Sequence, residues 1–311
     1  MAMLDIINLR THFPSPDGLV KAVDAVDLQI EKRERLGLIG ETGCGKTVLG
    51  MSIIRLLQPS TRVLGRIIYK GRDLLALEEE EMRLLRGKEI AMILQNPTTS
   101  LNPVLKVGDQ IAEVLQLHMG LDKKQAKTKA VQMLVATMIP EASKRADQYP
   151  HELSGGMKER VMIAMGLAGQ PSFVIADEPT KGLDAGTKSE IVRLIRDMTT
   201  DRSMLMITHD LAAAGEICDR IAVMYAGELL EEASAETILS EPCHPYTQGF
   251  IHSLPAQGLQ PIPGSSPSLI DPPQGCRFHP RCPKVMDICK KEHPSMIKLE
   301  KGHLARCFLC A

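Results

Sequence analysis

The segment that most constrains the fold of this chain is the octapeptide GETGCGKT at residues 40–47. It follows the short apolar run 36–39 and precedes a stretch with helical character at 48–57. This is the strand, loop and helix context in which the pattern GxxxxGK followed by Ser or Thr binds nucleotide phosphates. The glycines let successive backbone N–H groups turn toward phosphate oxygens, and the helix adds the positive end of its dipole. A glycine turn that merely opens a helix is the alternative interpretation.

Side chains in two segments are expected to bind a nucleotide and its magnesium ion. Lys46 is expected to reach the outer phosphates, and the Thr47 hydroxyl to ligate magnesium. The rest of the loop is expected to contact the nucleotide mainly through its backbone: Gly40, Glu41, Thr42, Gly43, Cys44 and Gly45. The sequence FVIADE at 173–178 places Asp177 to hold magnesium and Glu178 to orient or deprotonate the attacking water. An isolated Asp–Glu pair is more often an acidic helix cap, so this assignment depends on its order and spacing relative to the loop.

Strand and helix patterns alternate along the chain. Residues 26–31 alternate between apolar and polar, as in a half-buried strand of an antiparallel sheet. The runs 36–39, 173–176 and 204–207 are short and apolar, which is typical of buried parallel strands. Residues 191–198 carry apolar side chains at helical spacing and predict an amphipathic crossover helix. The chain is therefore predicted to have an α/β fold.

Charge and hydropathy exclude several kinds of protein. Lys plus Arg number 37 against 38 for Asp plus Glu, so no global basic field favours nucleic acid as a partner. The N-terminal residues lack the pattern of a secretory signal, and the longest uncharged run, 161–176, is too short and too polar to span a bilayer. Residues 221–225 and 228–232 predict a hairpin that closes the first domain. Prolines accumulate after Glu241, which predicts a second domain at 236–311.

A third motif, LSGGMKER at 153–160, lies between the phosphate loop and the acidic strand. With it the chain resembles the ABC ATPase family, whose signature motif is LSGGQ, over residues 1–235. The resemblance implies an α/β P-loop NTPase with a RecA-like core, an antiparallel β subdomain and a helical subdomain at about 97–165. A small Cys-rich C-terminal extension would follow this ATPase domain.

The resemblance also implies roles for residues outside the phosphate loop. Ser154, Gly155 and Gly156 would donate N–H groups to ATP held by the opposite subunit, so that each chain supplies half of each site. Gln95 would sense magnesium and the membrane partner. His209 would contact the terminal phosphate. Together with Lys46 and Glu178, these two residues would form the catalytic set.

Further positions either match the family or depart from it. Asp184 would lie in the loop that crosses the dimer interface, and Phe13 would stack on adenine. Lys158 and Glu159 stand where relatives of this branch usually carry Arg and Gln, and Gly182 replaces the more usual Ala. These departures predict a contact with the opposite subunit, and a coupling between the two sites, that differ from the family pattern.

Longer phrases resemble the oligopeptide, dipeptide and nickel importer branch of the family. They are QNPTTSLNP at 95–103, YPHELSGGM at 149–157, VMYAGELLE at 223–231 and HPYTQ at 244–248. This resemblance implies an ATP- and Mg²⁺-dependent ATPase, peripheral at the cytoplasmic side of the cell membrane. Its partners would be a homologous ATPase subunit, two transmembrane permeases and an external solute-binding protein. Peptides are the expected cargo, and nickel is the alternative.

Other kinds of ABC ATPase remain as alternatives. Relatives that act on DNA carry a long coiled coil between the phosphate loop and the signature, but here only about a hundred residues intervene. Relatives that act on ribosomes usually carry two ATPase halves on one chain, and this chain carries one. A non-hydrolysing regulatory partner is also less favoured, because the catalytic Lys, Asp, Glu and His are all present.

The C-terminal extension is rich in cysteine. Cys276, Cys282, Cys289 and Cys307 have nearly the spacing of an extension in the same importer branch that resembles a site for a 4Fe–4S cluster. Four thiolates are the ligands that such a cluster takes. Zinc would use the same ligands, Cys310 could substitute as the fourth ligand, and four reduced free thiols are the simplest alternative. An intracellular chain is not expected to contain structural disulfides.

Overall fold

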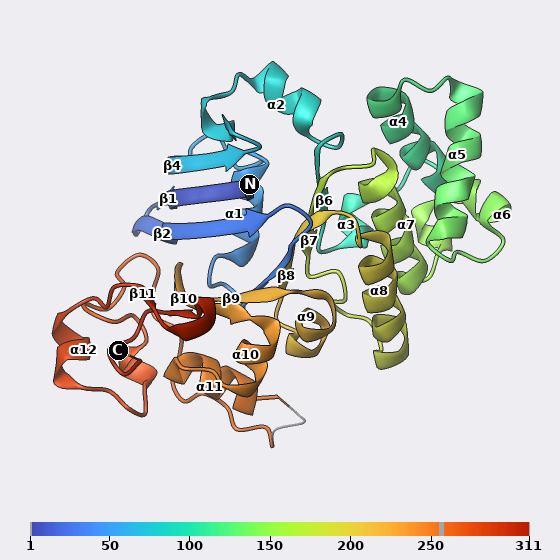
Figure 1. Ribbon diagram of the computed structural model, residues 1–311. Coiled ribbons are helices and arrows are strands. Elements are labelled where there is room, and N and C mark those ends of the chain that lie inside the picture. Colours follow the sequence, from blue (N-terminus) through green and yellow to red (C-terminus); the bar gives the residue numbers. More distant parts are fainter. Residues whose placement is uncertain (1, 255–257, 311) are drawn as a thin grey trace. The chain divides into compact units, whose positions relative to one another are not determined.

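The structure, a computed structural model, describes residues 2–254 and 258–310 (Figure 1). Its internal contacts divide the chain into two compact units, one formed by residues 1–76 with 206–311 and the other by 77–205. The division falls within strand β8 (Ser203–Thr208), all of whose residues are buried. The C-terminal extension therefore belongs to the unit that contains the phosphate loop.

The first unit contains an antiparallel sheet near the N-terminus. Its strands lie in the order β2 (Gly18–Glu31), β1 (Ala2–Ser15), β4 (Arg62–Tyr69) and β5 (Arg72–Asp73). On β2 the side chains of Val26, Leu28 and Ile30 are buried, whereas Asp27 and Gln29 are exposed. The alternation in the sequence thus predicted this strand and its buried face correctly, because side chains in a strand point to opposite faces in turn.

A second set of strands in the same unit belongs to the sheet from which the phosphate loop leaves, at the end of β3 (Arg35–Ile39). They are β3, β9 (Arg220–Tyr225), β10 (Glu228–Ser234), β11 (Ile297–Lys298) and β12 (Leu304–Ala305). β3 pairs in parallel with β9, and β9 forms with β10 the hairpin that the sequence predicts, turning at Ala226 and Gly227. β12 pairs with the other edge of β10, so the end of the chain extends this sheet.

Short helices complete the first unit. They are α1 (Lys46–Ile53), η1 (Leu74–Ala76), α9 (Leu211–Ile217), α10 (Ala235–Ser240), α11 (Pro245–His252), η4 (His279–Arg281), α12 (Asp287–Lys291) and η5 (Glu300–Gly302). α1 ends at Ile53, four residues before the end of the helical stretch predicted at 48–57. Arg55 adopts a left-handed φ of 54°, which an α-helix does not accommodate.

The second unit combines a pair of parallel strands with a group of helices. β6 (Ile90–Ile93) pairs with β7 (Phe173–Asp177), whose five residues are all buried, as expected for a parallel strand. The helices are α2 (Glu79–Leu85), α3 (Pro97–Ser100), α4 (Val107–Met119), α5 (Lys123–Ala136), α6 (Ala142–Ala146), η2 (Pro150–Glu152), α7 (Gly155–Ala168) and α8 (Ala185–Met198). α4, α5 and α7 pack on one another (Figure 1).

Helix α8 is the amphipathic crossover helix that the sequence predicts. Its buried face consists of Ile191, Val192, Leu194 and Ile195, with Arg193 exposed between them. No helix in the described part of the chain is both long enough and apolar enough to cross a bilayer.

Candidate nucleotide-binding site

The phosphate loop lies where the sequence places it, between β3 and α1. Gly40, Gly43 and Gly45 have backbone φ values of 152°, 84° and 111°, which residues other than glycine rarely adopt. A Cβ at Gly40 would lie 2.1 Å from a carbonyl oxygen of β9, and one at Gly45 would lie 2.0 Å from a carbonyl oxygen of β2. A Cβ at Gly43 would meet no atom within 4 Å. Close packing thus requires glycine at the two ends of the loop, whereas its middle is open.

Lys46 is folded back onto the loop. Its Nζ donates hydrogen bonds to the carbonyl oxygens of Gly40 and Glu41, at 2.7 and 2.9 Å, and its side chain is buried. Thr47 lies exposed in the first turn of α1. The ammonium group is therefore held where a phosphate oxygen could replace a carbonyl oxygen as its partner. Burial raises the pKa of the neighbouring Cys44 thiol, so this cysteine stays protonated and unreactive at neutral pH.

The two acidic residues lie at the end of β7 in the second unit. Asp177 is its last residue, and Glu178 follows with a left-handed φ of 48°. Both side chains are buried. Such a backbone conformation costs a residue other than glycine on the order of 1–3 kcal/mol and is concentrated at functional sites. The catalytic role that the sequence assigns to Glu178 stays a prediction.

The signature segment forms an open helix start. Ser154 caps α7 by accepting a hydrogen bond from the backbone N–H of Met157 at 3.3 Å. Gly155 is exposed, and a Cβ added there would meet no atom within 4 Å. Because the first N–H groups of a helix have no partner within the helix, such a start suits an anionic ligand. The trans contact that the sequence assigns to this segment stays a prediction.

The remaining predicted residues lie at the ends of elements or on a strand. Gln95 follows β6 in the second unit, where Asp184 caps α8 by accepting hydrogen bonds from the N–H groups of Gly186 and Thr187. In the first unit, Phe13 is a half-buried residue of β1, and His209 follows β8 directly and is exposed.

Comparison with known families decides what kind of protein this is. Residues 23–181 match the family model described as ABC transporter. The chain belongs to the ABC transporter family, as an ATPase subunit. Residues 230–289 match a second model, described as oligopeptide/dipeptide transporter, C-terminal region, and this match covers the first part of the extension.

Relatives of this ABC ATPase align with it over nearly their whole lengths. The probable peptide ABC transporter ATP-binding protein y4tR of Sinorhizobium fredii is 44% identical, with 98% of this chain and 94% of the relative aligned. The oligopeptide transport ATP-binding protein OppD of Escherichia coli is 42% identical over 99% of this chain and 93% of its own. The dipeptide transport ATP-binding protein DppD of Bacillus subtilis is 42% identical over 99% and 94%.

Solved structures confirm the predicted fold of the ABC ATPase. The dimeric cassette MJ0796 bound to ADP and Pi aligns with a TM-score of 0.68 and 24% identity, over 75% of this chain and 99% of that one. The cbiO1 protein of Clostridium perfringens, part of the cbiONQ transporter complex, aligns with a TM-score of 0.65 and 26% identity, over 77% and 91%. Both share the α/β architecture that the motifs predict.

Glu159, which departs from the usual pattern of this ABC ATPase branch, is a buried carboxyl. Its side chain on α7 is 2% exposed, and its Oε1 has no hydrogen-bond partner in the described part of the chain. Burial raises the pKa of Glu159 to about 8. The carboxyl is thus mostly protonated at neutral pH in the folded protein, whereas it ionises in the unfolded chain.

Replacing Glu159 by glutamine is expected to stabilise the protein at pH 8 and to change its stability little at pH 5. Between the ordinary pKa of glutamate and about 8, the folded state binds the extra proton, so the stability of the wild type falls as pH rises. The free energy of unfolding at pH 8 should increase by a few kcal/mol at most. Urea denaturation at both pH values measures it, and a gain that is the same at pH 5 and pH 8 would contradict this explanation.

The extension of the ABC ATPase brings its cysteines together. One pocket is lined by four free cysteines: Cys276, Cys282, Cys289 and Cys307. Burial, followed by the neighbouring thiols, raises the pKa of Cys276 to about 11. Among residues 2–254 and 258–310, no group of three or more His, Cys, Asp or Glu side chains is arranged so that it could hold a metal ion.

One expectation about the cysteines was wrong. Cys243 and Cys310 form a disulfide, with Cα atoms 6.0 Å apart, although the chain was expected to contain no structural disulfide. Bonded in this way, Cys310 does not serve as a substitute ligand for Cys307. The expectation rested on the redox compartment, which says nothing about which sulfur atoms the fold brings into contact.

One contact of the phosphate loop was not predicted from the sequence. Glu41 was expected to contribute mainly its backbone, but its carboxylate forms two hydrogen bonds with the guanidinium of Arg281, at 2.8 and 2.9 Å. The signal that could have revealed a partner is an acidic side chain in a loop that binds anions, because such a charge needs a nearby cation. The partner itself lies 240 residues away in the sequence.

Proposed function

We propose that this ABC ATPase is the ATP-hydrolysing subunit of a peptide importer, bound peripherally at the cytoplasmic side of the cell membrane. The observation that carries the proposal is the match of residues 230–289 to the C-terminal region of oligopeptide/dipeptide transporters. Full-length relatives named for peptide, oligopeptide or dipeptide transport, at 42–44% identity, support it. Membrane permeases, a homologous ATPase subunit and a solute-binding protein are its partners in this proposal.

The proposed chemistry gives each motif residue one role. In the first unit the open loop binds the ATP phosphates, Lys46 exchanges its carbonyl partners for a phosphate oxygen, and Thr47 is a magnesium ligand. In the second unit Asp177 is the further magnesium ligand, and Glu178 accepts a proton from the attacking water. The other proposed contributors are Gln95 at the magnesium, His209 at the terminal phosphate and Phe13 at the adenine.

The proposed subunit works as a dimer. Ser154, Gly155 and Gly156 of one chain present their N–H groups to ATP bound in the loop of the other chain, and Asp184 borders that interface. ATP binding then draws the two chains together, and hydrolysis releases them. The segment that follows Gln95 receives the permease in this proposal, so ATP turnover and cargo movement are coupled.

Uptake in cells tests the cargo. Cells that carry either the native chain or Glu178→Gln are compared for uptake of labelled dipeptide and of nickel. We expect dipeptide uptake to collapse with the variant while nickel uptake is unchanged. Loss of nickel uptake alone would replace the peptide assignment with the nickel alternative. Unchanged uptake of both would contradict the transport proposal and favour an ABC ATPase with another role.

We propose in addition that the cysteine pocket of the extension holds a 4Fe–4S cluster. Its support is the convergence of Cys276, Cys282, Cys289 and Cys307 on one enclosed pocket. In such a cluster each thiolate binds a different iron, so the four sulfur atoms need not converge on one point, as ligands of a single zinc ion must. When bound, the cluster cross-links the segments that carry the cysteines. Because burial raises the pKa of Cys276, Cys282 and Cys307, binding releases protons from these thiols.

Anaerobic purification tests the cluster. The native protein is expected to be brown and to contain iron and acid-labile sulfide, whereas Cys282→Ser should lose most of both. Cys218→Ala is the matched control, since Cys218 is a buried free cysteine that does not line the pocket. A colourless native protein with stoichiometric zinc would establish the zinc alternative. A colourless protein with no metal would establish four free thiols.

A further inference from the structure

The C-terminal extension holds Glu41 of the phosphate loop from several sides. Its carboxylate accepts hydrogen bonds from Nη1 and Nη2 of Arg281, at 2.8 and 2.9 Å, and from Oγ of Ser266 at 2.5 Å. Its backbone N–H donates to the hydroxyl of Tyr246 at 2.9 Å. Arg281 and Tyr246 are both buried. The conformation of this loop residue is therefore set by the extension.

Glu41 is also linked directly to the lysine that is expected to bind phosphate. Its carbonyl oxygen accepts a hydrogen bond from Nζ of Lys46 at 2.9 Å. Partial burial opposes ionisation of the carboxyl, but the bonds from Arg281 and Ser266 and the charge of Lys46 outweigh it and lower the pKa of Glu41. The Glu41 side chain is thus ionised, and Arg281 is the cation that hydrogen-bonds to its carboxylate.

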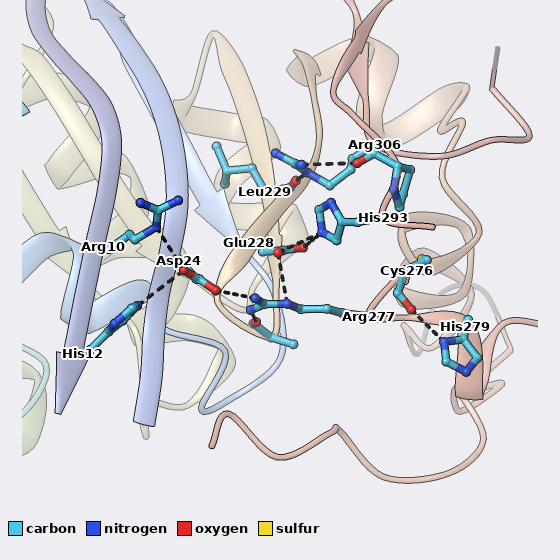
Figure 2. Close-up of polar contacts among 12 residues, drawn as sticks. Arg10, His12, Asp24, Glu228, Leu229, Cys276, Arg277, His279, His293 and Arg306 are labelled. Atoms are coloured by element: carbon cyan, nitrogen blue, oxygen red, sulfur yellow. Dashed lines mark hydrogen bonds and ion pairs between the residues drawn. The ribbon is translucent and has the colours of Figure 1, made fainter. Parts of the chain in front are cut away.

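A second arginine of the extension supports the neighbouring turn. Arg277 donates to the carbonyl oxygen of Ala226 at 2.6 Å. It also pairs with Asp24 and Glu228, as Figure 2 shows. The same turn contacts the phosphate loop, because the N–H of Gly227 donates to the carbonyl oxygen of Cys44 at 2.9 Å.

Each of these arginines is adjacent in sequence to a cysteine of the pocket. Arg277 follows Cys276, and Arg281 precedes Cys282. The segment between these two cysteines therefore connects the pocket to the phosphate loop directly through Arg281, and indirectly through the turn that Arg277 contacts.

We propose that Arg281 is a positioning residue for ATP binding, acting through Glu41. By neutralising the Glu41 carboxylate and holding it against the extension, Arg281 keeps a negative charge away from the ATP phosphates. It also leaves the Lys46 ammonium available to them, since an unpaired carboxylate would attract this ammonium itself. The C-terminal extension is then part of the nucleotide site. This inference rests on the proposed binding of ATP by the loop.

The test is Mg-ATP affinity in the full chain. Arg281→Gln is expected to raise the Kd for Mg-ATP about tenfold or more, because the charge on Glu41 is left without its cation. Adding Glu41→Gln to that variant removes the charge and should restore most of the affinity. An arginine that only held the fold together would not be rescued by a second substitution that removes its partner's charge.

Arg306→Gln is the matched control. This arginine also lies in the extension, and it donates to the carbonyl oxygens of Leu229 and Pro294 rather than to the loop. Its loss loosens the extension without changing the charge beside the ATP, so the Kd should stay within about threefold of the native value. An equal rise in Kd with Arg306→Gln would overturn the proposal, because general loosening would then explain the effect.

Two further outcomes separate this inference from the function on which it rests. If the native chain binds ATP and Arg281→Gln binds it equally well, or if Glu41→Gln brings no recovery, the role of Arg281 is overturned while the ATPase assignment stands. If the native chain fails to bind ATP, the proposed function itself fails, and the inference with it. Iron content, measured on the same preparations, shows whether a lower affinity follows loss of the proposed cluster. A tenfold effect in a variant that keeps its iron supports the role of Arg281 through Glu41.

Discussion

Replacing Glu178 by glutamine is expected to lower the rate of ATP hydrolysis about 10²- to 10⁴-fold, which is the usual contribution of a general base. Glutamine has nearly the same shape, so it can keep the buried position and the left-handed backbone that Glu178 has after β7. It cannot accept the proton of the attacking water. ATP binding should therefore survive while turnover collapses, and the measurement is steady-state phosphate release beside Mg-ATP affinity.

The matched control for this variant is Glu113→Gln, a change of the same kind at an exposed position on α4. Its rate of phosphate release should be that of the native protein. If Glu178→Gln lost less than tenfold in rate, Glu178 would not be the general base. If ATP binding were lost together with turnover, the effect would lie in the folding of the site rather than in the chemical step.

The second large effect is expected for the stability of the first unit. Arg277→Ala should lower the free energy of unfolding by about 3–5 kcal/mol, which is typical when one partner of a buried ion pair is removed. The guanidinium, 7% exposed, lies between Asp24 and Glu228, and Figure 2 shows how it joins the two carboxylates. Without it both carboxylates lose their main partner, although Arg10 and His12 still contact Asp24 and His293 still contacts Glu228.

Urea denaturation measures this loss, and a surface arginine provides the control. Arg83 pairs with Glu80 at 3.1 Å on α2, but the side chains are 66% and 80% exposed. Exposed pairs contribute about 0–1 kcal/mol, so Arg83→Ala should scarcely change the unfolding midpoint. An equally small effect of Arg277→Ala would mean that the extension does not need this cation to stay attached to the sheet.

The features that were predicted correctly depend on residues close to one another in the sequence. The phosphate loop needs glycines at fixed spacing, and the left-handed φ of Gly43 and Gly45 shows why. The alternation in β2 and the apolar face of α8 follow from the periods of strand and helix. The open start of α7 at Ser154 follows from its capping residue and the two glycines that come next. Short-range geometry is enough for each of these, so the sequence alone reveals them.

β10 shows what local pattern does not reveal. Its glutamates at 228 and 231 read as polar positions of a hairpin, yet both side chains are buried. Glu231 is fully buried, and its carboxylate bonds to Nε2 of His303 at 2.7 Å and to the backbone N–H groups of Cys243 and His244. The C-terminal extension covers this strand and supplies the partners. A buried carboxylate is tolerated only when such hydrogen-bond partners are present. The residues next to β10 in the sequence do not indicate which partners these are.

The sequence by itself determined the ATPase family, the phosphate loop and the residues expected to bind the nucleotide, because each motif consists of residues that are close together in the sequence. Only the tertiary structure decided how the extension is attached. It paired Glu41 with Arg281, Glu228 with Arg277 and Cys243 with Cys310, each with a residue between 49 and 240 positions away. Residues so far apart in the sequence come into contact only when the whole chain packs. A charged side chain that is buried in this way then needs a partner of opposite charge beside it.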